Sequence, residues 1–169
     1  MDHLRAIGLP VPETETHSAW EAVRSRSTTG SIFVKAVSGV EGRGAGVSAF
    51  CNGAPPEPPF PGPWHVETTQ LSDGFDRKLY VAGDQVFGLL KPWPRRDDAP
   101  TLQFEPTNEM AALALKVGQA VGSEIYGVDL VGKGDVFSIV DVNPFPGFRG
   151  VAGAPQAIAR YIANRVVER

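Results

Sequence analysis

Residues 126–130 read Tyr-Gly-Val-Asp-Leu, and residues 140–150 read Val-Asp-Val-Asn-Pro-Phe-Pro-Gly-Phe-Arg-Gly. Their apolar and β-branched residues predict two strands, over 125–131 and 136–142. The intervening Gly-Lys-Gly-Asp sequence at 132–135 is typical of a turn. The two strands should therefore lie next to each other in one sheet.

Three polar side chains stand out in this pair of strands. Asp141 and Asn143 are two residues apart, so they should project from one face while Val140 and Val142 enter the core. The turn should bring Asp129 almost directly opposite Asp141. Two carboxylates and an amide oxygen on one face repel unless a hard cation lies between them, and Mg²⁺ completed by phosphate oxygens and water suits such a set. The alternative is that Asp141 and Asn143 only initiate the turn before the next proline.

Together with Asp129, the sequence Asp-Val-Asn-Pro-Phe-Pro-Gly-Phe-Arg-Gly resembles the metal-binding end of the ATP-grasp superfamily. Similar stretches occur in ribosomal-protein glutamate ligases, inositol polyphosphate kinases and D-alanine–D-alanine ligases. The resemblance implies an α+β fold in which two small lobes clasp a nucleotide, with ATP and Mg²⁺ as cofactors and Asp129, Asp141 and Asn143 as metal ligands. It places an N-terminal lobe with a glycine-rich loop and a proline-rich strap at 1–63, and a C-terminal lobe with a hinge strand and the metal site at 64–169.

In the N-terminal half, Lys35 follows Phe-Val and resembles the strand lysine that reaches the nucleotide phosphates. Its alternative is a solvated lysine on a strand. The run Gly-Val-Glu-Gly-Arg-Gly-Ala-Gly at 39–46 resembles the glycine-rich loop that closes over the phosphates. Small residues let backbone N–H groups approach phosphate oxygens, so Gly42, Arg43 and Gly44 are expected nucleotide contacts. A flexible hairpin tip has the same composition.

Three further positions carry over from the resemblance. Glu67 lies in the segment that resembles the hinge strand, where an acidic residue helps to position the nucleotide. Residues 75–84 resemble the family's basic strand and Gly-Asp turn, so Lys78 or Arg77 should contact phosphate or substrate. Neighbours on a strand face opposite ways, so only one of the two can do so. Arg149 is a candidate clamp for an acceptor carboxylate, and a solvated loop arginine is its alternative.

The remaining pattern predicts short elements separated by turns, in keeping with 19 glycines and 15 prolines. Thr107 and Gly122 should cap the ends of one helix, and Ser18 should cap another. The last helix should turn Ile158, Tyr161, Ile162 and Val166 inward. The proline-rich segment 55–63 should be an extended strap between the lobes, with an SH3-type ligand as the alternative. Beyond the two strands above, the expected strands are 14–17, 31–37, 47–51, 64–70, 77–82 and 85–90, and the expected helices are 4–7, 18–26, 108–121 and one from Pro155.

Composition excludes several classes of protein. The 169 residues include 16 Lys and Arg against 19 Asp and Glu, so a surface that binds nucleic acid or anionic membrane is not expected. The sequence contains no run of about 18 apolar residues, so a transmembrane helix is not expected. The first residues do not resemble a secretory signal. The single cysteine, Cys51, cannot form an internal disulfide and is expected to be buried on a strand. A cytoplasmic location is expected.

The resemblance implies a minimal ATP- and Mg²⁺-dependent ligase. It would join a carboxylate to an amine or a thiol through an acyl phosphate, with a small molecule or a peptide as the acceptor. ATP-grasp enzymes usually carry an additional N-terminal domain that supplies part of the acceptor site. This chain begins at the first lobe, so a separate subunit could supply that part. A small-molecule kinase of the same fold and a non-catalytic nucleotide-binding subunit are the alternatives, and a homo-oligomer stays open.

Overall fold

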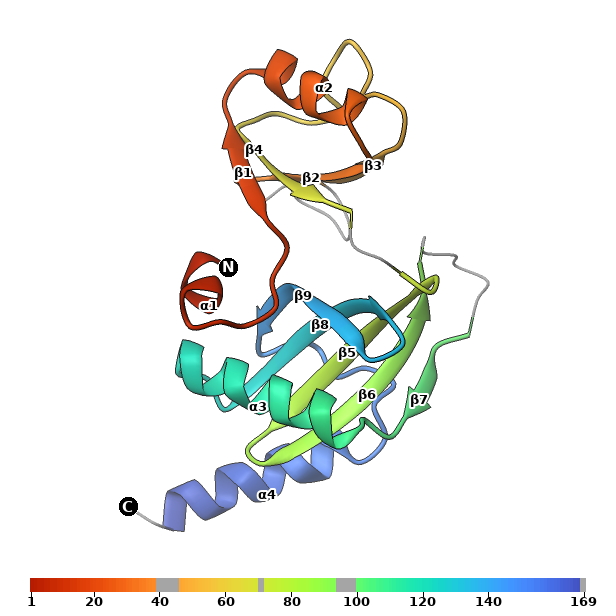
Figure 1. The fold of residues 1–169 in the computed structure, drawn as a ribbon. Helices are drawn as coiled ribbons and strands as arrows, with labels where there is room; N and C mark the ends of the chain where they lie inside the picture. Colours follow the sequence, from red (N-terminus) through yellow and green to blue (C-terminus); the bar gives the residue numbers. More distant parts are fainter. Residues whose placement is uncertain (39–45, 70–71, 94–99, 168–169) are drawn as a thin grey trace. The chain divides into compact units, whose positions relative to one another are not determined.

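The computed structural model describes four stretches of the chain, residues 1–38, 46–69, 72–93 and 100–167. The chain divides into two compact units, each with an antiparallel sheet, which makes the predicted α+β class correct (Figure 1). The smaller unit is Pro12–Gln70, and the larger unit combines Met1–Val11 with Leu71–Arg169. This division differs from the expected halves, because strand β4 (Trp64–Thr68) pairs inside the smaller unit.

The described residues of the smaller unit form one helix and a four-stranded sheet in the order β1-β4-β2-β3. A tryptophan pair forms the centre of its core: the rings of Trp20 and Trp64 lie 5.1 Å apart. Trp20 enters this core from the first position of its helix, and the N-cap is Ala19 without a side-chain bond, so the expected Ser18 cap is wrong. The elements that complete the unit are β1 (Thr14–His17), α2 (Trp20–Thr28), β2 (Ile32–Ala36) and β3 (Val47–Phe50).

The proline-rich segment belongs to this unit as well. It leads from β3 to β4, two strands of the same sheet, so it is not a strap between the units. Its carbonyls accept hydrogen bonds from both core tryptophans, Pro55 from Trp20 at 2.9 Å and Phe60 from Trp64 at 3.1 Å. Cys51 is exposed rather than buried, because β3 ends at Phe50, which pairs with the first residue of β2.

The larger unit has a five-stranded sheet in the order β7-β6-β5-β8-β9. Side chains alternate between its faces, so Leu79 and Val128 pack into the core with α3 while Tyr80 and Leu89 pack with the segment that leads into α4. Thr107 and Gly122 cap α3 as predicted. The elements are α1 (Asp2–Ala6), β5 (Phe75–Ala82), β6 (Gln85–Pro92), β7 (Leu102–Phe104), α3 (Asn108–Val121), β8 (Ile125–Lys133), β9 (Val136–Pro144) and α4 (Ala154–Val167).

Strand β9 contains a bulge that changes the predicted pattern. Asp141 pairs with Asp129, but the next residue of β8, Leu130, pairs with Ile139, so Val140 is an extra residue. Ile139 is fully buried in the core, and the expectation that Val140 occupies this place is wrong. A bulge of this kind bends the strand and increases its twist.

Helix α4 is buried only along its first turns. Ala154 and Ala157 are buried and Ile158 packs against the same cluster. Ile162 is 49% exposed and Val166 is 69% exposed, so the prediction that both face inward is wrong. The apolar residues that pack between α4 and the sheet, among them Tyr80 and Phe148, reach only the first turns of the helix. Among the described helices, none is long and apolar enough to cross a membrane.

Candidate functional site

Three adjacent strands of the larger unit bring polar side chains together on one face. Lys78 of β5 pairs with Asp129 of β8, and Asp129 pairs with Asp141 of β9. The direct opposition of Asp129 and Asp141 is therefore present as expected. Alternation along each strand adds Asp76 and Asn143 to the same face. We call Asp76, Lys78, Asp129, Asp141 and Asn143 the polar cluster.

One ammonium in the cluster is shared by two carboxylates. Lys78 Nζ donates to Asp129 Oδ2 and lies 3.1 Å from Asp76 Oδ2. All three side chains are largely buried: Lys78 is 23% exposed, Asp129 is 13% exposed and Asp76 is 15% exposed. Burial alone would lower the pKa of Lys78, but the two carboxylates outweigh it and raise that pKa above its usual value. Lys78 is therefore an ammonium at neutral pH.

The carboxylates outnumber the cations in this cluster. Burial raises the pKa of Asp129 to about 6; Lys78 opposes the shift, and the charges of Asp76 and Asp141 add to it. Within these five residues, three ionised carboxylates face the one ammonium of Lys78, and Lys91 of β6, which pairs with Asp76 in the sheet register, is the neighbouring cation. Such a site favours the arrival of another cation.

Asp141 and Asn143 form a small network at the edge of the cluster. Asn143 Nδ2 donates to Asp141 Oδ2 at 2.9 Å, and the backbone N–H of Val142 donates to Asp141 Oδ1 at 3.0 Å. Within the described part of the chain, no group of three His, Cys, Asp or Glu residues is arranged to hold a metal ion. The donor set still fits Mg²⁺ in kind, because all its ligand atoms are hard oxygens and phosphate and water would supply the rest.

Asp76 is the member of the cluster that the sequence analysis missed. Its Oδ1 is buried and has no hydrogen-bond partner among the described residues. A signal for it was available, since Asp76 is two residues before Lys78 and shares its face. Arg77, by contrast, faces the other way: its guanidinium lies 5.2 Å from the centre of the Phe137 ring and binds Asp73. The structure thus selects Lys78 over Arg77 as the basic residue on this face.

The loop after β9 contains two aromatic residues in the left-handed region, Phe145 at φ 47° and Phe148 at φ 43°. Non-glycine residues adopt this conformation at a cost, and it often marks functional loops. Phe148 is buried, with its ring 5.3 Å from that of Tyr80, and anchors the loop. Arg149 follows with an exposed side chain, and its role toward an acceptor stays a prediction.

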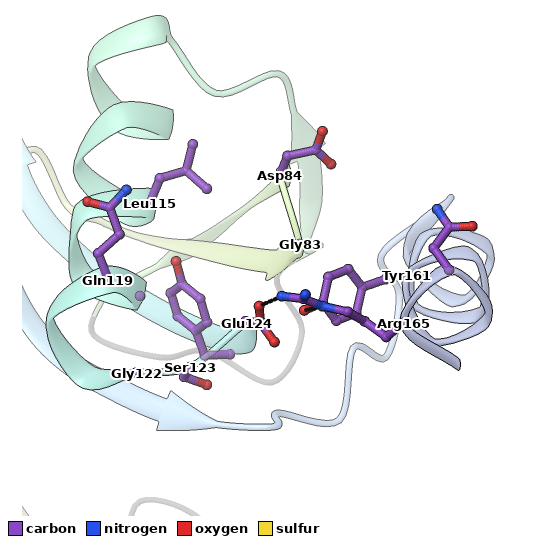
Figure 2. Close-up of a pocket in the computed structure, with 12 residues that line it drawn as sticks. Gly83, Asp84, Leu115, Gln119, Gly122, Ser123, Glu124, Tyr161 and Arg165 are labelled. Carbon is purple, nitrogen blue, oxygen red and sulfur yellow. Dashed lines mark hydrogen bonds and ion pairs between the residues drawn. The ribbon is translucent and has the colours of Figure 1, made fainter. Parts of the chain in front are cut away.

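A pocket of about 770 Å³ lies at the opposite end of β5 from Asp76 and Lys78 (Figure 2). The β5–β6 turn, the end of α3, the start of β8 and α4 surround it. Arg165 reaches across its rim to bind Glu124 and lies 5.5 Å from the centre of the Tyr161 ring. None of the expected site residues lines this pocket, so it is separate from the polar cluster.

In the smaller unit, Lys35 and Glu67 form a nearly buried ion pair. Lys35 Nζ lies 2.9 Å from Glu67 Oε1 and 2.8 Å from Oε2, and the two side chains are 27% and 6% exposed. The pair joins β2 to the adjacent strand β4. A predicted phosphate lysine and a predicted nucleotide-positioning glutamate are therefore in direct contact.

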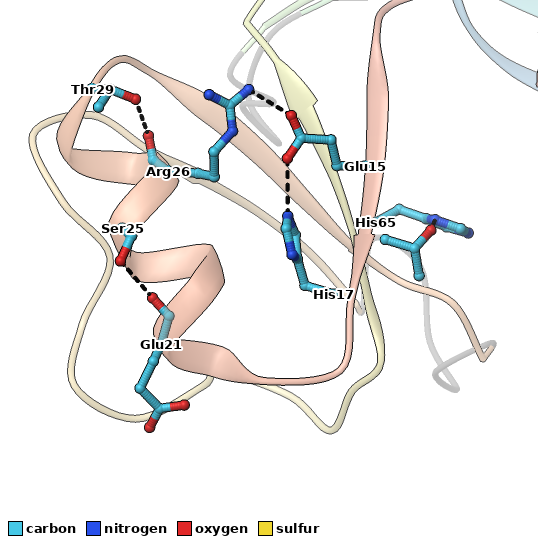
Figure 3. A network of polar contacts seen from close by, with 8 residues as sticks. Glu15, His17, Glu21, Ser25, Arg26, Thr29 and His65 are labelled. Atoms are coloured by element: carbon cyan, nitrogen blue, oxygen red, sulfur yellow. Dashed lines mark hydrogen bonds and ion pairs between the residues drawn. The ribbon is translucent and has the colours of Figure 1, made fainter.

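Other polar contacts join α2 and β4 to the edge strand β1 (Figure 3). Arg26 of α2 binds Glu15 at 3.0 Å, and the other oxygen of Glu15 lies 3.1 Å from His17 Nε2. Thr16 lies 2.9 Å from His65 Nδ1 on β4. These contacts hold the elements of the unit together and include none of the expected site residues.

The predicted phosphate-loop residues Gly42, Arg43 and Gly44 lie outside the described residues, so their role stays a prediction. The assignments of Lys35, Glu67 and Lys78 to the nucleotide, and of the cluster to a metal, are likewise untested by the geometry. What the geometry supplies is the proximity of Lys78, Asp129, Asp141 and Asn143 on one sheet face.

Solved structures match almost the whole chain. The ATP-grasp ligase PsnB, complexed with a phosphomimetic variant of a minimal precursor, Mg and ADP, has a TM-score of 0.72 at 22% identity, over 97% of this chain and 57% of that one. The macrocyclase MdnC, bound with precursor peptide MdnA from Microcystis aeruginosa MRC, has a TM-score of 0.70 at 17% identity, over 96% and 58%. The D-alanine-D-alanine ligase from Coxiella burnetii has a TM-score of 0.64 at 19% identity, over 99% and 58%.

No protein-family profile matches the chain, and no curated protein sequence gives a significant match. The likeness to the solved structures establishes the fold, and this chain has the ATP-grasp fold that its sequence resembles. The chain spans about 57% of the length of PsnB.

Proposed function

We propose that this chain is the nucleotide-binding and metal-binding part of an ATP-dependent ligase that joins a carboxylate to an amine or a thiol. The single observation that carries the proposal is the polar cluster, which occurs on the five-stranded sheet of an ATP-grasp fold. Asp129, Asp141 and Asn143 would hold Mg²⁺, and Lys78 would contact a phosphate oxygen or the acceptor. Mg²⁺ would neutralise charge on the phosphate oxygens when bound.

The proposed reaction has two steps. The γ-phosphoryl group passes from ATP to an oxygen of the acceptor carboxylate, which forms an acyl phosphate and releases ADP. An amine nitrogen or a thiolate sulfur then attacks the acyl carbon and expels inorganic phosphate, and an amine also loses a proton. The contribution of the chain is positioning and charge neutralisation. Lys35, Arg43 and Glu67 would contact the nucleotide, and Arg149 would hold the acceptor carboxylate.

A peptide is the acceptor that the comparisons favour. PsnB is described in complex with a precursor, and MdnC with the precursor peptide MdnA. The match to a D-alanine-D-alanine ligase makes a small amino acid the other candidate acceptor. The chain matches 57% of PsnB and 58% of MdnC, and a separate subunit that contributes to the acceptor site is a candidate partner.

Calorimetric titration of ATP in the presence of MgCl₂ tests the nucleotide and metal part of the proposal. The wild-type chain should bind ATP much more tightly with Mg²⁺ than without it, and the Asp141→Ala/Asn143→Ala variant should not show this gain. The matched control is Asp84→Asn, a charge removed at the far end of β5, which should bind as wild type does. Folded wild-type protein that does not bind ATP with MgCl₂ would contradict the proposal.

Product analysis then separates ligase from kinase. ADP release should depend on a carboxylate acceptor, tested with glutamate-containing and aspartate-containing peptides and with single amino acids. Mass spectrometry should find the loss of one water from the joined acceptors. A stable phosphate ester would identify a kinase instead, and nucleotide binding without any turnover would identify a non-catalytic subunit.

A further inference from the structure

Asp76 has no part in the reaction proposed above, yet it is among the most constrained side chains of the polar cluster. It is 15% exposed, and its Oδ2 lies 3.1 Å from Lys78 Nζ. Its Oδ1 is buried without a hydrogen-bond partner among the residues that the structure describes. Buried polar atoms are nearly always hydrogen-bonded, so an unpaired carboxylate oxygen requires a reason. Asp76 has capacity for one more donor.

The donor that the structure already places against the Asp76 carboxylate is Lys78. Its ammonium has three N–H groups and binds both Asp129 and Asp76 in this structure. Asp129 and Asp76 are on neighbouring strands, and Lys78 lies directly across from Asp129 in the sheet register. The ammonium therefore already contacts the carboxylate that has a spare oxygen.

The proposed metal site creates a conflict for Lys78. Asp129 cannot serve a divalent cation well while its carboxylate is bound to an ammonium, and the two cations would repel each other at short range. Without a second acceptor, the ammonium would have to leave a largely buried position for water. A nearby carboxylate with an unused oxygen removes that need.

We propose that Asp76 is a positioning residue that takes over Lys78 when Asp129 ligates Mg²⁺, so that both cations are held in one site. The inference rests on the metal site proposed above. Lys78 keeps its contact with Asp76 Oδ2, gains Oδ1 and gives up Asp129. The ammonium then stays on the sheet face beside the metal, where it can contact a phosphate or acceptor oxygen.

Titration of MgCl₂ into the ADP-saturated chain tests this role. Asp76→Asn keeps the shape and removes the carboxylate, so Mg²⁺ should bind about tenfold more weakly, the size of a coupling between contacting groups. In the Lys78→Met background the same change should cost less than about threefold, because the competing ammonium is gone. The control Asp73→Asn removes a charge that pairs with Arg77 and should leave Mg²⁺ affinity unchanged. Thermal unfolding of each variant verifies that it is folded.

A second variant separates position from charge. Asp76→Glu retains the charge and moves the carboxylate by one methylene group, so it should weaken Mg²⁺ binding if position matters. Wild-type affinity in both Asp76→Asn and Asp76→Glu overturns the inference and leaves the metal site standing. An equal loss from Asp76→Asn with and without Lys78 overturns it as well, because charge alone would then explain the effect. If folded wild-type protein binds no Mg²⁺, the inference and the proposed metal site fall together.

Discussion

The ion pair of Lys35 and Glu67 predicts an unequal response to the loss of its two partners. The Glu67 side chain is 6% exposed, whereas the Lys35 side chain is 27% exposed. Removing the lysine leaves a buried carboxylate without that ammonium, but removing the carboxylate leaves a lysine that can become hydrated. Lys35→Met should therefore destabilise the smaller unit much more than Glu67→Gln does.

The exposures set the magnitudes. Breaking a fully buried pair costs about 3–5 kcal/mol, and the partial exposure of Lys35 places Lys35→Met near the low end, at about 3 kcal/mol. Glu67→Gln exchanges a charged acceptor for a neutral one of the same shape and should cost about 1 kcal/mol. The double variant Lys35→Met/Glu67→Gln should recover part of the first loss, because it leaves no buried charge.

Urea unfolding at neutral pH measures these differences, with tryptophan fluorescence as the signal. Trp20 and Trp64 are in the core of this unit and report its unfolding. With an m value of about 1 kcal/mol/M for so small a unit, the midpoint should fall by about 3 M for Lys35→Met and about 1 M for Glu67→Gln. An equal cost for Glu67→Gln and Lys35→Met, or a double variant less stable than Lys35→Met alone, would contradict the unequal roles of the two partners.

Three further predictions concern the larger unit. Gly118→Ala should destabilise it by about 1–3 kcal/mol in urea, despite the better helix propensity of alanine, because the added Cβ would lie 2.2 Å from the Tyr126 hydroxyl; a gain in stability would contradict this. Thr107→Ala should cost about 1 kcal/mol in the same assay through loss of the helix cap, whereas Thr107→Ser should cost far less. The hydrogen bond from Arg77 lowers the pKa of Asp73 below 3.8, so Asp73 should contribute stability that is present above pH 3.8 and is lost as the pH falls through its lowered pKa. The stability difference between wild type and Asp73→Asn should shrink over that range, and a constant difference would count against the pair.

Local sequence signals predicted the parts of the fold that local physics determines. The apolar stripe of α3 and its two capping residues specify both helix ends, since the cap bonds lie within a few residues of one another. The turn between β8 and β9 likewise places Asp129 across from Asp141, because a short connection leaves little choice of partner strand. This part of the candidate site could be predicted from the sequence.

The features that sequence reasoning missed depend on distant partners. Trp64–Thr68 reads as a strand, but its place in the smaller unit is decided by pairing with β1 and β2. Ile162 and Val166 have helical spacing, yet no spacing rule says where the sheet beneath them ends. Val140 alternates with Val142 as a core residue should, and only the pairing with Leu130 reveals that Ile139 occupies the core instead.

The extra residue in β9 lies between a residue that fills the core, Ile139, and a residue of the polar cluster, Asp141. Without Val140, Ile139 would be followed directly by Asp141, and the strand would alternate between core and cluster without interruption. The inserted residue therefore changes the local path of the backbone at Asp141 but not the identity of the side chains on either face. Related chains with one residue more or fewer at this bulge could orient the carboxylates differently and keep the same core residues. The geometry of the polar cluster could thus diversify at this position without loss of the fold.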